Sequence, residues 1–149
     1  EFSNNLDLGY NLNTAWMTAE INLFHNWVGN YIYQQRAANE LFNEVKQNFQ
    51  LSEQLCDECF PVLNTLQAPA TYKGFEAQLS FPLMQNTLGA LDLDLFSDFA
   101  HGSFDSGADV PRMSPMRYGF QLSYENNEWT SNLRFTRGEP QANPGFNET

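Results

Sequence analysis

Leucine and aspartate alternate one by one in the segment LDLDL, residues 91–95. Successive side chains of a β-strand point to opposite faces, so as a strand this segment has one apolar face and one acidic face. In a soluble protein the leucine face would be buried in a core. In a membrane barrel it would contact lipid, and the acidic face would line a wet lumen. Every other inference from the sequence depends on which of these two holds.

The same alternation recurs along the whole chain. Together with residues 89–104 it predicts about six strands, the other five lying in residues 6–12, 16–33, 72–83, 117–125 and 129–137. Alternation sustained over this many segments predicts an all-β protein with an antiparallel up-and-down sheet.

The predicted connections alternate strictly between short and long. Tight turns are expected near residue 13, near 85–87 and near 126–127, whereas residues 34–68 and 104–115 form long loops. Antiparallel strands reverse direction at each connection, so all short turns lie at one end of the sheet and all long loops at the other. Outer-membrane barrels have this asymmetry, and several segments reach the roughly 9–11 residues that a tilted membrane strand needs. These patterns favour a transmembrane β-barrel segment.

The charge of the chain limits its partners. Its 149 residues contain 18 Asp and Glu against 7 Lys and Arg, a net charge of -11. This charge argues against nucleic acid as a partner, because phosphates require a basic surface. An acidic lining suits the attraction of cations, although a solvated acidic surface has the same composition.

Several motifs resemble one family of membrane proteins. These are NNLDLGY, INLFHNWVGNYIY, ATYKGFEAQLSF, VPRMSPMRYGFQLSYENNEW and LRFTRGEPQANPGFNET, in this order. The fourth matches a P-R-x-P-P-x-R-x-G pattern at Pro111, Arg112, Pro115, Arg117 and Gly119, and departs from it at Ser114. With these motifs the chain resembles the TonB-dependent outer-membrane receptors, and is most similar to their zinc-uptake (ZnuD-like) branch.

The resemblance implies a segment from the later part of a larger barrel of roughly 22 strands with a plugged lumen. Residues 1–149 are then part of one β-barrel domain in the bacterial outer membrane, with the long loops extracellular and the plug domain elsewhere in the parent chain. The implied partners are outer-membrane lipid, that plug, the TonB energy-coupling complex acting through it, and a metal ion or metal complex.

The transported substrate remains open at this point. Zinc is the expected cargo, with no tightly bound cofactor, and a ferric-siderophore or haem-type complex is the alternative. A non-energised porin or adhesin barrel would keep the same strand pattern, and a soluble acidic β-barrel would turn its leucine faces toward a small apolar ligand. No catalytic residues are predicted: Ser97 and His101 are too far apart along a strand to act together, and no nucleophile motif is present.

Two kinds of side chain are candidate metal ligands. Cys56 and Cys59 form a C-x-x-C motif in the longest loop, where an oxidising environment favours a disulfide. Zinc ligation and free thiols remain alternatives for this pair. His25 and His101 are the other candidates, with Asp98, Asp105 and Asp109 as oxygen donors. Alternation places both histidines on the outward face, which also fits polar residues at the lipid boundary.

The predicted lumen lining consists of charged residues on the opposite face, which also fits a wall that contacts a plug through hydrogen bonds and water. They are Glu20, Glu76, Asp92, Asp94, Asp98, Arg117 and Arg134. In the longest loop, Leu41, Val45 and Phe49 recur every four residues, which predicts a short amphipathic helix at the barrel mouth.

Overall fold

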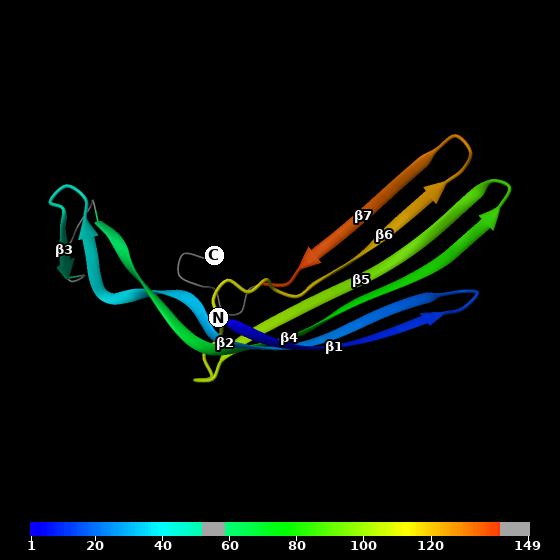
Figure 1. The fold of residues 1–149 in the computed structure, drawn as a ribbon. Helices are drawn as coiled ribbons and strands as arrows, with labels where there is room; N and C mark the ends of the chain where they lie inside the picture. Colours follow the sequence, from blue (N-terminus) through cyan, green and yellow to red (C-terminus); the bar gives the residue numbers. More distant parts are fainter. Residues whose placement is uncertain (52–58, 141–149) are drawn as a thin grey trace.

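The computed structural model describes residues 1–51 and 59–140, apart from the side chains of residues 38 and 39, and forms one antiparallel sheet (Figure 1). Its strands are β1 (Phe2–Asn13), β2 (Thr18–Asn43), β3 (Asn48–Leu51), β4 (Cys59–Asn86), β5 (Gly89–Phe104), β6 (Arg117–Glu125) and β7 (Thr130–Gly138). They lie in the order β1-β2-β4-β5-β6-β7, with β3 paired to β2. The prediction of an all-β, up-and-down antiparallel sheet is confirmed. Within the described residues, no helix is long and apolar enough to cross a membrane.

The ends of the sheet differ as the sequence predicts. Figure 1 shows the β1–β2, β4–β5 and β6–β7 turns together at one end, and the β2–β4 and β5–β6 connections at the other. Short polar side chains close the tight turns. The Thr14 hydroxyl donates to the Met17 carbonyl at 2.8 Å, and the Asn86 side-chain oxygen accepts the Leu88 backbone N–H at 2.8 Å.

The predicted helix around residues 41–49 is wrong. Leu41 lies in β2 and Phe49 in β3, and a turn between the two strands contains Val45. The Asn43 side chain accepts the Lys46 backbone N–H at 2.7 Å, and Gln47 adopts a positive φ of 50°, which reverses the chain where a helix would continue it. The four-residue spacing therefore arises from a hairpin, in which the rings of Phe42 and Phe49 lie 5.4 Å apart.

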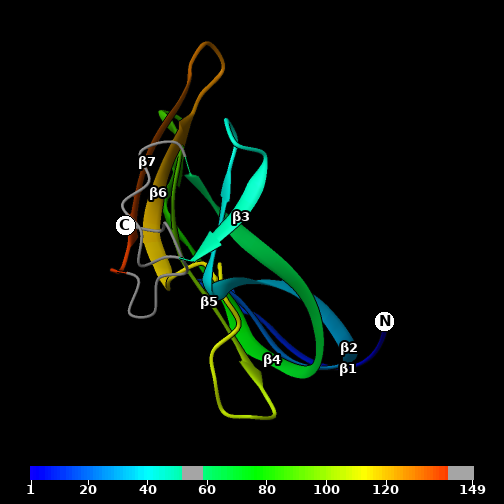
Figure 2. The same ribbon diagram turned by 90° about the vertical axis from the view of Figure 1, so that its left-hand side faces the viewer.

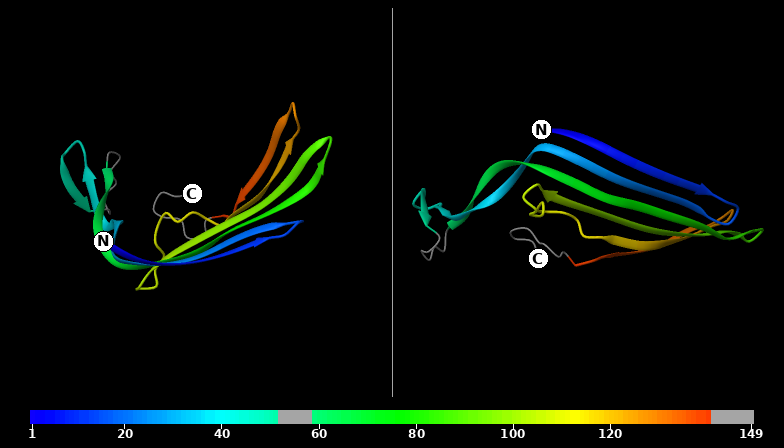
Figure 3. Two further views of the ribbon diagram at one scale, coloured as in Figure 1. Left: turned by 45° about the vertical axis from the view of Figure 1, so that its right-hand side comes forward. Right: turned by 90° about the horizontal axis from the view of Figure 1, so that it is seen from below.

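The predicted irregular loop at residues 34–68 is largely regular strand. β2 and β4 remain paired from Thr18↔Ser80 out to Asn43↔Cys59, so they form a two-stranded ribbon that bends away from the sheet (Figures 1 and 3). The register shifts between Val28 and Tyr31, where Asn30 has a φ of 57°. This bulge separates the sheet from the ribbon.

The sheet is a single curved layer with two unlike faces (Figure 2). One unbroken row of paired residues crosses all six main strands on the apolar face: Leu12, Ala19, Leu79, Leu95, Phe120 and Phe135. No described segment covers most of this face, and Leu23 and Leu133 are 46% and 61% exposed. In the described structure β1 and β7 are open edges, so the sheet is not closed. Both features fit a segment of a larger barrel.

A small core forms where the β5–β6 connection folds back along β5. Val110 donates its backbone N–H to the Gly102 carbonyl at 2.9 Å. Its side chain packs with Ala70 and Phe104, and all three are less than a tenth exposed. This cluster holds the connection against the sheet at the end opposite the tight turns.

Candidate functional site

All seven charged residues predicted to line the lumen lie on the polar face of the sheet. Strict pairing from β1 to β7 leaves every second side chain on this face. The central residues surround a hollow of about 630 Å³, lined by Gly9, Asn11, Glu20, Asn22, Glu76, Gln78, Asp94, Asp98, Arg117, Gln121 and Arg134. Asp92 lies beside it, in a second hollow that also contains Asp94.

The carboxylates that line the two hollows lie in four successive rows of the polar face, from the end with the long connections toward the tight turns. Glu76 and Asp98 are direct register partners in the first row. Glu20 lies in the second row, Asp94 in the third and Asp92 in the fourth. Neighbouring rows are two residues apart, or about 7 Å along a strand. We call these five residues the carboxylate ladder.

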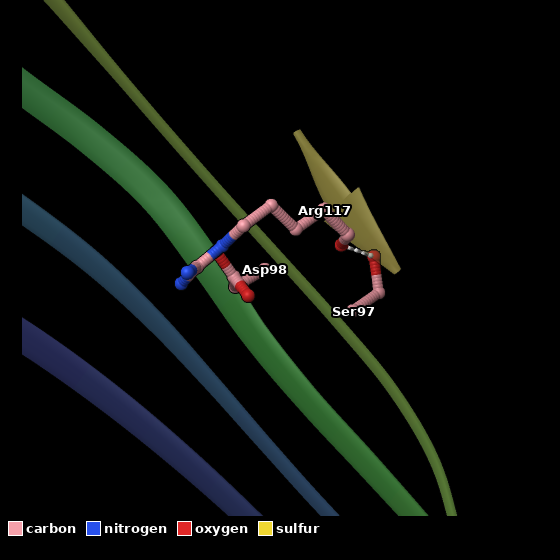
Figure 4. A network of polar contacts seen from close by, with 3 residues as sticks. All are labelled: Ser97, Asp98 and Arg117. Atoms are coloured by element: carbon pink, nitrogen blue, oxygen red, sulfur yellow. Dashed lines mark hydrogen bonds and ion pairs between the residues drawn. The ribbon is translucent and has the colours of Figure 1, made fainter. Parts of the chain in front are cut away.

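Of these carboxylates, Asp98 forms an ion pair in the described part of the chain. Its Oδ2 atom lies 3.0 Å from both Nε and Nη2 of Arg117 (Figure 4). The Ser97 hydroxyl donates to the Arg117 carbonyl at 3.1 Å and ties β5 to the start of β6. The Asp94 carboxylate accepts a hydrogen bond from the Ser80 hydroxyl, which leaves its charge in place.

The second arginine of this face makes no ion pair within the described residues. The Arg134 guanidinium lies 4.3 Å from the centre of the Phe96 ring, and its Nη1 is 3.5 Å from the Gln121 side-chain oxygen. Neither contact compensates Glu20, Glu76, Asp92 or Asp94, which form no ion pair within the described residues. The polar face therefore carries a net negative charge next to its hollow.

Aromatic side chains lie over glycines that are their direct cross-strand partners. Phe24 faces Gly74 and Phe96 faces Gly119. A Cβ atom at Gly119 would lie 2.7 Å from Cζ of Phe96, and one at Gly74 would lie 2.5 Å from Cζ of Phe24. The rings therefore lie close to the backbone, and larger residues at these glycines would push them into the hollow. Sequence reasoning missed these pairs, although aromatic residues on the polar face were a visible signal.

The structure does not gather the predicted metal ligands into one site. Within the described residues, no group of three or more His, Cys, Asp and Glu side chains could hold a metal ion. His25 and His101 lie on the apolar face, whereas Asp98 lies on the polar face. His25 stacks on Trp27 at 4.1 Å, and its Nε2 atom is buried without a hydrogen-bond partner in the described structure. His101 Nε2 lies 3.4 Å from Asp109.

The remaining candidates lie near the long connections. Asp105 is exposed in the turn after β5, and its backbone N–H donates to the Pro69 carbonyl at 3.3 Å. Cys59 begins β4 and is disulfide-bonded in the structure. Cys56 lies outside the described residues, so the predicted pairing of the two cysteines stays a prediction.

Comparison with known proteins identifies the family of this sheet. The family model for the TonB dependent receptor-like β-barrel matches residues 1–149. None of the curated proteins matches the chain. Proteins of this receptor family are transporters of the bacterial outer membrane, and family membership implies a plug domain, contact with TonB and a transported substrate. With its continuous up-and-down sheet and its apolar outer face, the chain belongs to the β-barrel domain of the TonB-dependent receptors.

Proposed function

We propose that the receptor to which this barrel segment belongs imports a scarce metal ion, with zinc as the first candidate. The observation that carries this proposal is the carboxylate ladder on the polar face. Five carboxylates and two guanidinium groups line the two hollows, and one ion pair forms among them within the described residues. Such a surface attracts cations and raises their local concentration.

The spacing of the ladder suits passage rather than tight capture. Its rows are about 7 Å apart along the strands, so a cation would meet several separated carboxylates in turn. Conduction requires sites that bind strongly enough for entry and weakly enough for release. We expect the plug to supply any tighter ligands, and we expect the long connections to be extracellular.

The same charge pattern ranks the alternative substrates. A metal–siderophore or haem-type complex that carries negative charge would be repelled by the ladder, whereas a free divalent cation would be attracted. Such a complex is therefore the second candidate. Family membership favours an energised receptor over the porin and adhesin alternatives.

The test is a zinc titration by calorimetry on the complete receptor in detergent, together with radioactive zinc uptake in cells. Ferric siderophore and haem serve as competing substrates. Replacing Glu20 with Gln and Asp94 with Asn should slow zinc uptake several-fold at low salt. The control, Glu44→Gln, removes one carboxylate in the β2–β3 turn and should leave uptake unchanged.

The outcomes separate the candidate sites. Loss of tight zinc binding when Cys56 and Cys59 become serine would assign capture to the long connection and contradict the disulfide. Binding that survives those changes would point to the plug or the ladder. No zinc binding by the unaltered receptor would overturn the zinc proposal and favour the siderophore or haem-type complex.

A further inference from the structure

A methionine of the β5–β6 connection packs against the small core at the end of β5. The buried members of this core are Ala70, Phe104 and Val110, and the half-buried Met113 lies against them. The chain has four methionines, all within the described residues, and Met113 is the one that contacts this core. A thioether therefore helps to hold the connection on the sheet.

The backbone next to Met113 is in a conformation that its neighbours must maintain. Arg112 has a positive φ of 64°, which a non-glycine residue keeps only where surrounding contacts impose it. On one side of Arg112, Val110 packs in the core and donates its backbone N–H to the Gly102 carbonyl at 2.9 Å. On the other side, Met113 packs against the same core. Loss of the Met113 contact would free Arg112 to return to an ordinary conformation.

A polar cavity gives small solutes access to Met113. It has a volume of about 270 Å³ and lies between β5, the connection and the residues that follow β7. Met113 is part of its wall, and so are His101, Asp109, Ser114 and Glu139. A cavity of this size with several polar groups in its wall holds water. Hydrogen peroxide is close to water in size and polarity, so the same cavity admits it.

We propose that Met113 is a peroxide-sensitive modification site, and that its oxidation releases the β5–β6 connection from β5. The thioether sulfur attacks one oxygen of the peroxide, so that an S–O bond forms and the O–O bond breaks. The other oxygen leaves as water after proton transfer. The sulfur loses two electrons, the peroxide gains them, and the product is methionine sulfoxide.

The sulfoxide cannot keep the packing of the thioether. Oxidation turns a flexible apolar side chain into a polar one, and its oxygen would have no hydrogen-bond donor among the side chains of Ala70, Phe104 and Val110. The oxygen instead turns toward the water of the cavity, and the side chain leaves the core. The long connections are expected to be extracellular, so peroxide from outside the cell reaches this site. The carboxylate ladder takes no part in the reaction.

The experiment treats the complete receptor in detergent with hydrogen peroxide. Mass spectrometry locates the sulfoxides, and tryptic cleavage after the exposed Arg112 reports release of the connection. Oxidation of Met113 should speed this cleavage about fivefold or more, and methionine sulfoxide reductases should reverse the effect. A synthetic peptide of residues 105–120, with and without the sulfoxide, corrects for any direct effect on trypsin.

Two leucine variants identify the methionine responsible. Met113→Leu keeps an apolar side chain of similar volume, so the connection should stay packed and its cleavage should no longer respond to peroxide. The matched control is Met84→Leu. It removes a half-buried methionine near the tight turns, on β4, and should respond to peroxide as the unaltered receptor does.

Each contrary result overturns a defined part of the proposal. Unchanged cleavage of a receptor that carries the sulfoxide at Met113 would exclude release of the connection. Oxidation of Met84 without oxidation of Met113 would show that the cavity does not admit peroxide. An undiminished response of the Met113→Leu variant would assign the effect to another methionine, first of all Met116, which also lines the cavity. Failure of the unaltered receptor to bind zinc would leave all these results unchanged.

Discussion

Replacing Gly119 with alanine should destabilise the barrel, because this position has no room for a methyl group. Gly119 lies on β6 opposite Thr136, with the Phe96 ring over it. A Cβ atom there would lie 2.1 Å from the Phe135 carbonyl oxygen and 2.7 Å from the Phe96 ring. Ordinary contacts of a Cβ atom begin at about 3.4 Å, so β7 must shift and the ring must move.

The expected cost follows from these two displacements. Overpacking that shifts backbone costs about 1–3 kcal/mol. Moving the Phe96 ring also removes the contact with the Arg134 guanidinium, 4.3 Å away, which contributes about 0.5–1 kcal/mol at an exposed site. Gly119→Ala should therefore lower the free energy of unfolding by about 1.5–4 kcal/mol.

The measurement compares this variant with the same substitution at Gly9. A Cβ atom at Gly9 would have its nearest neighbour, the Asn22 side-chain oxygen, at 4.0 Å. Gly9→Ala should be neutral or should stabilise by about 0.4–1 kcal/mol through the unfolded state. Urea midpoints of the complete receptor in micelles, followed by tryptophan fluorescence, report both changes. Equal midpoints for the two variants would refute the reasoning.

Three further predictions test the faces and the connections. Leu95→Lys should destabilise the receptor by about 2–4 kcal/mol, as a charge at the centre of a lipid-facing band does, whereas Gln121→Lys on the polar face should cost little in the same urea assay. Phe104→Ala should loosen the small core around Val110 and speed tryptic cleavage after the exposed Arg112 roughly tenfold or more, whereas Leu63→Ala in the ribbon should not. If Cys56 and Cys59 form a disulfide, maleimide should label the receptor after reduction alone, and Cys59→Ser should make Cys56 reactive without reduction.

The main strands could be predicted from the sequence, because the alternation of apolar and polar residues indicates directly which side chains share a face. The β2–β4 register is unbroken from Thr18 to Val28, and the β5–β6 register from Ala90↔Glu125 to Asp98↔Arg117. Counting residues therefore assigned these side chains to the correct faces. Counting fails where the backbone turns. The hairpin at residues 43–48 depends on an Asn43 hydrogen bond and a positive φ at Gln47, and its residue spacing imitates a helix.

The candidate site was harder to predict, because its properties depend on neighbours across strands. Sequence reasoning placed the carboxylates on one face, but it could not say that Arg117 pairs with Asp98 while Arg134 lies on Phe96. It also left His25 and His101 as either metal ligands or polar residues at the lipid boundary, and it did not foresee that Lys73 lies between them in the register. Cross-strand partners follow from register, and register is set by turns and bulges that alternation alone does not locate.

The acidic side chains are distributed unevenly between the two faces of the sheet. For the choice of partners, this distribution matters more than the net charge of -11. The ladder carboxylates all lie on the polar face, whereas Lys73 and Arg137 lie on the apolar side, at the border nearest the long connections. A uniformly acidic surface would repel the phosphates of a membrane as strongly as it attracts metal ions. Because the sheet is one layer thick, alternation along each strand is enough to separate the two charges. One sheet can therefore carry carboxylates on its inner side and cationic side chains at the border of its apolar outer side.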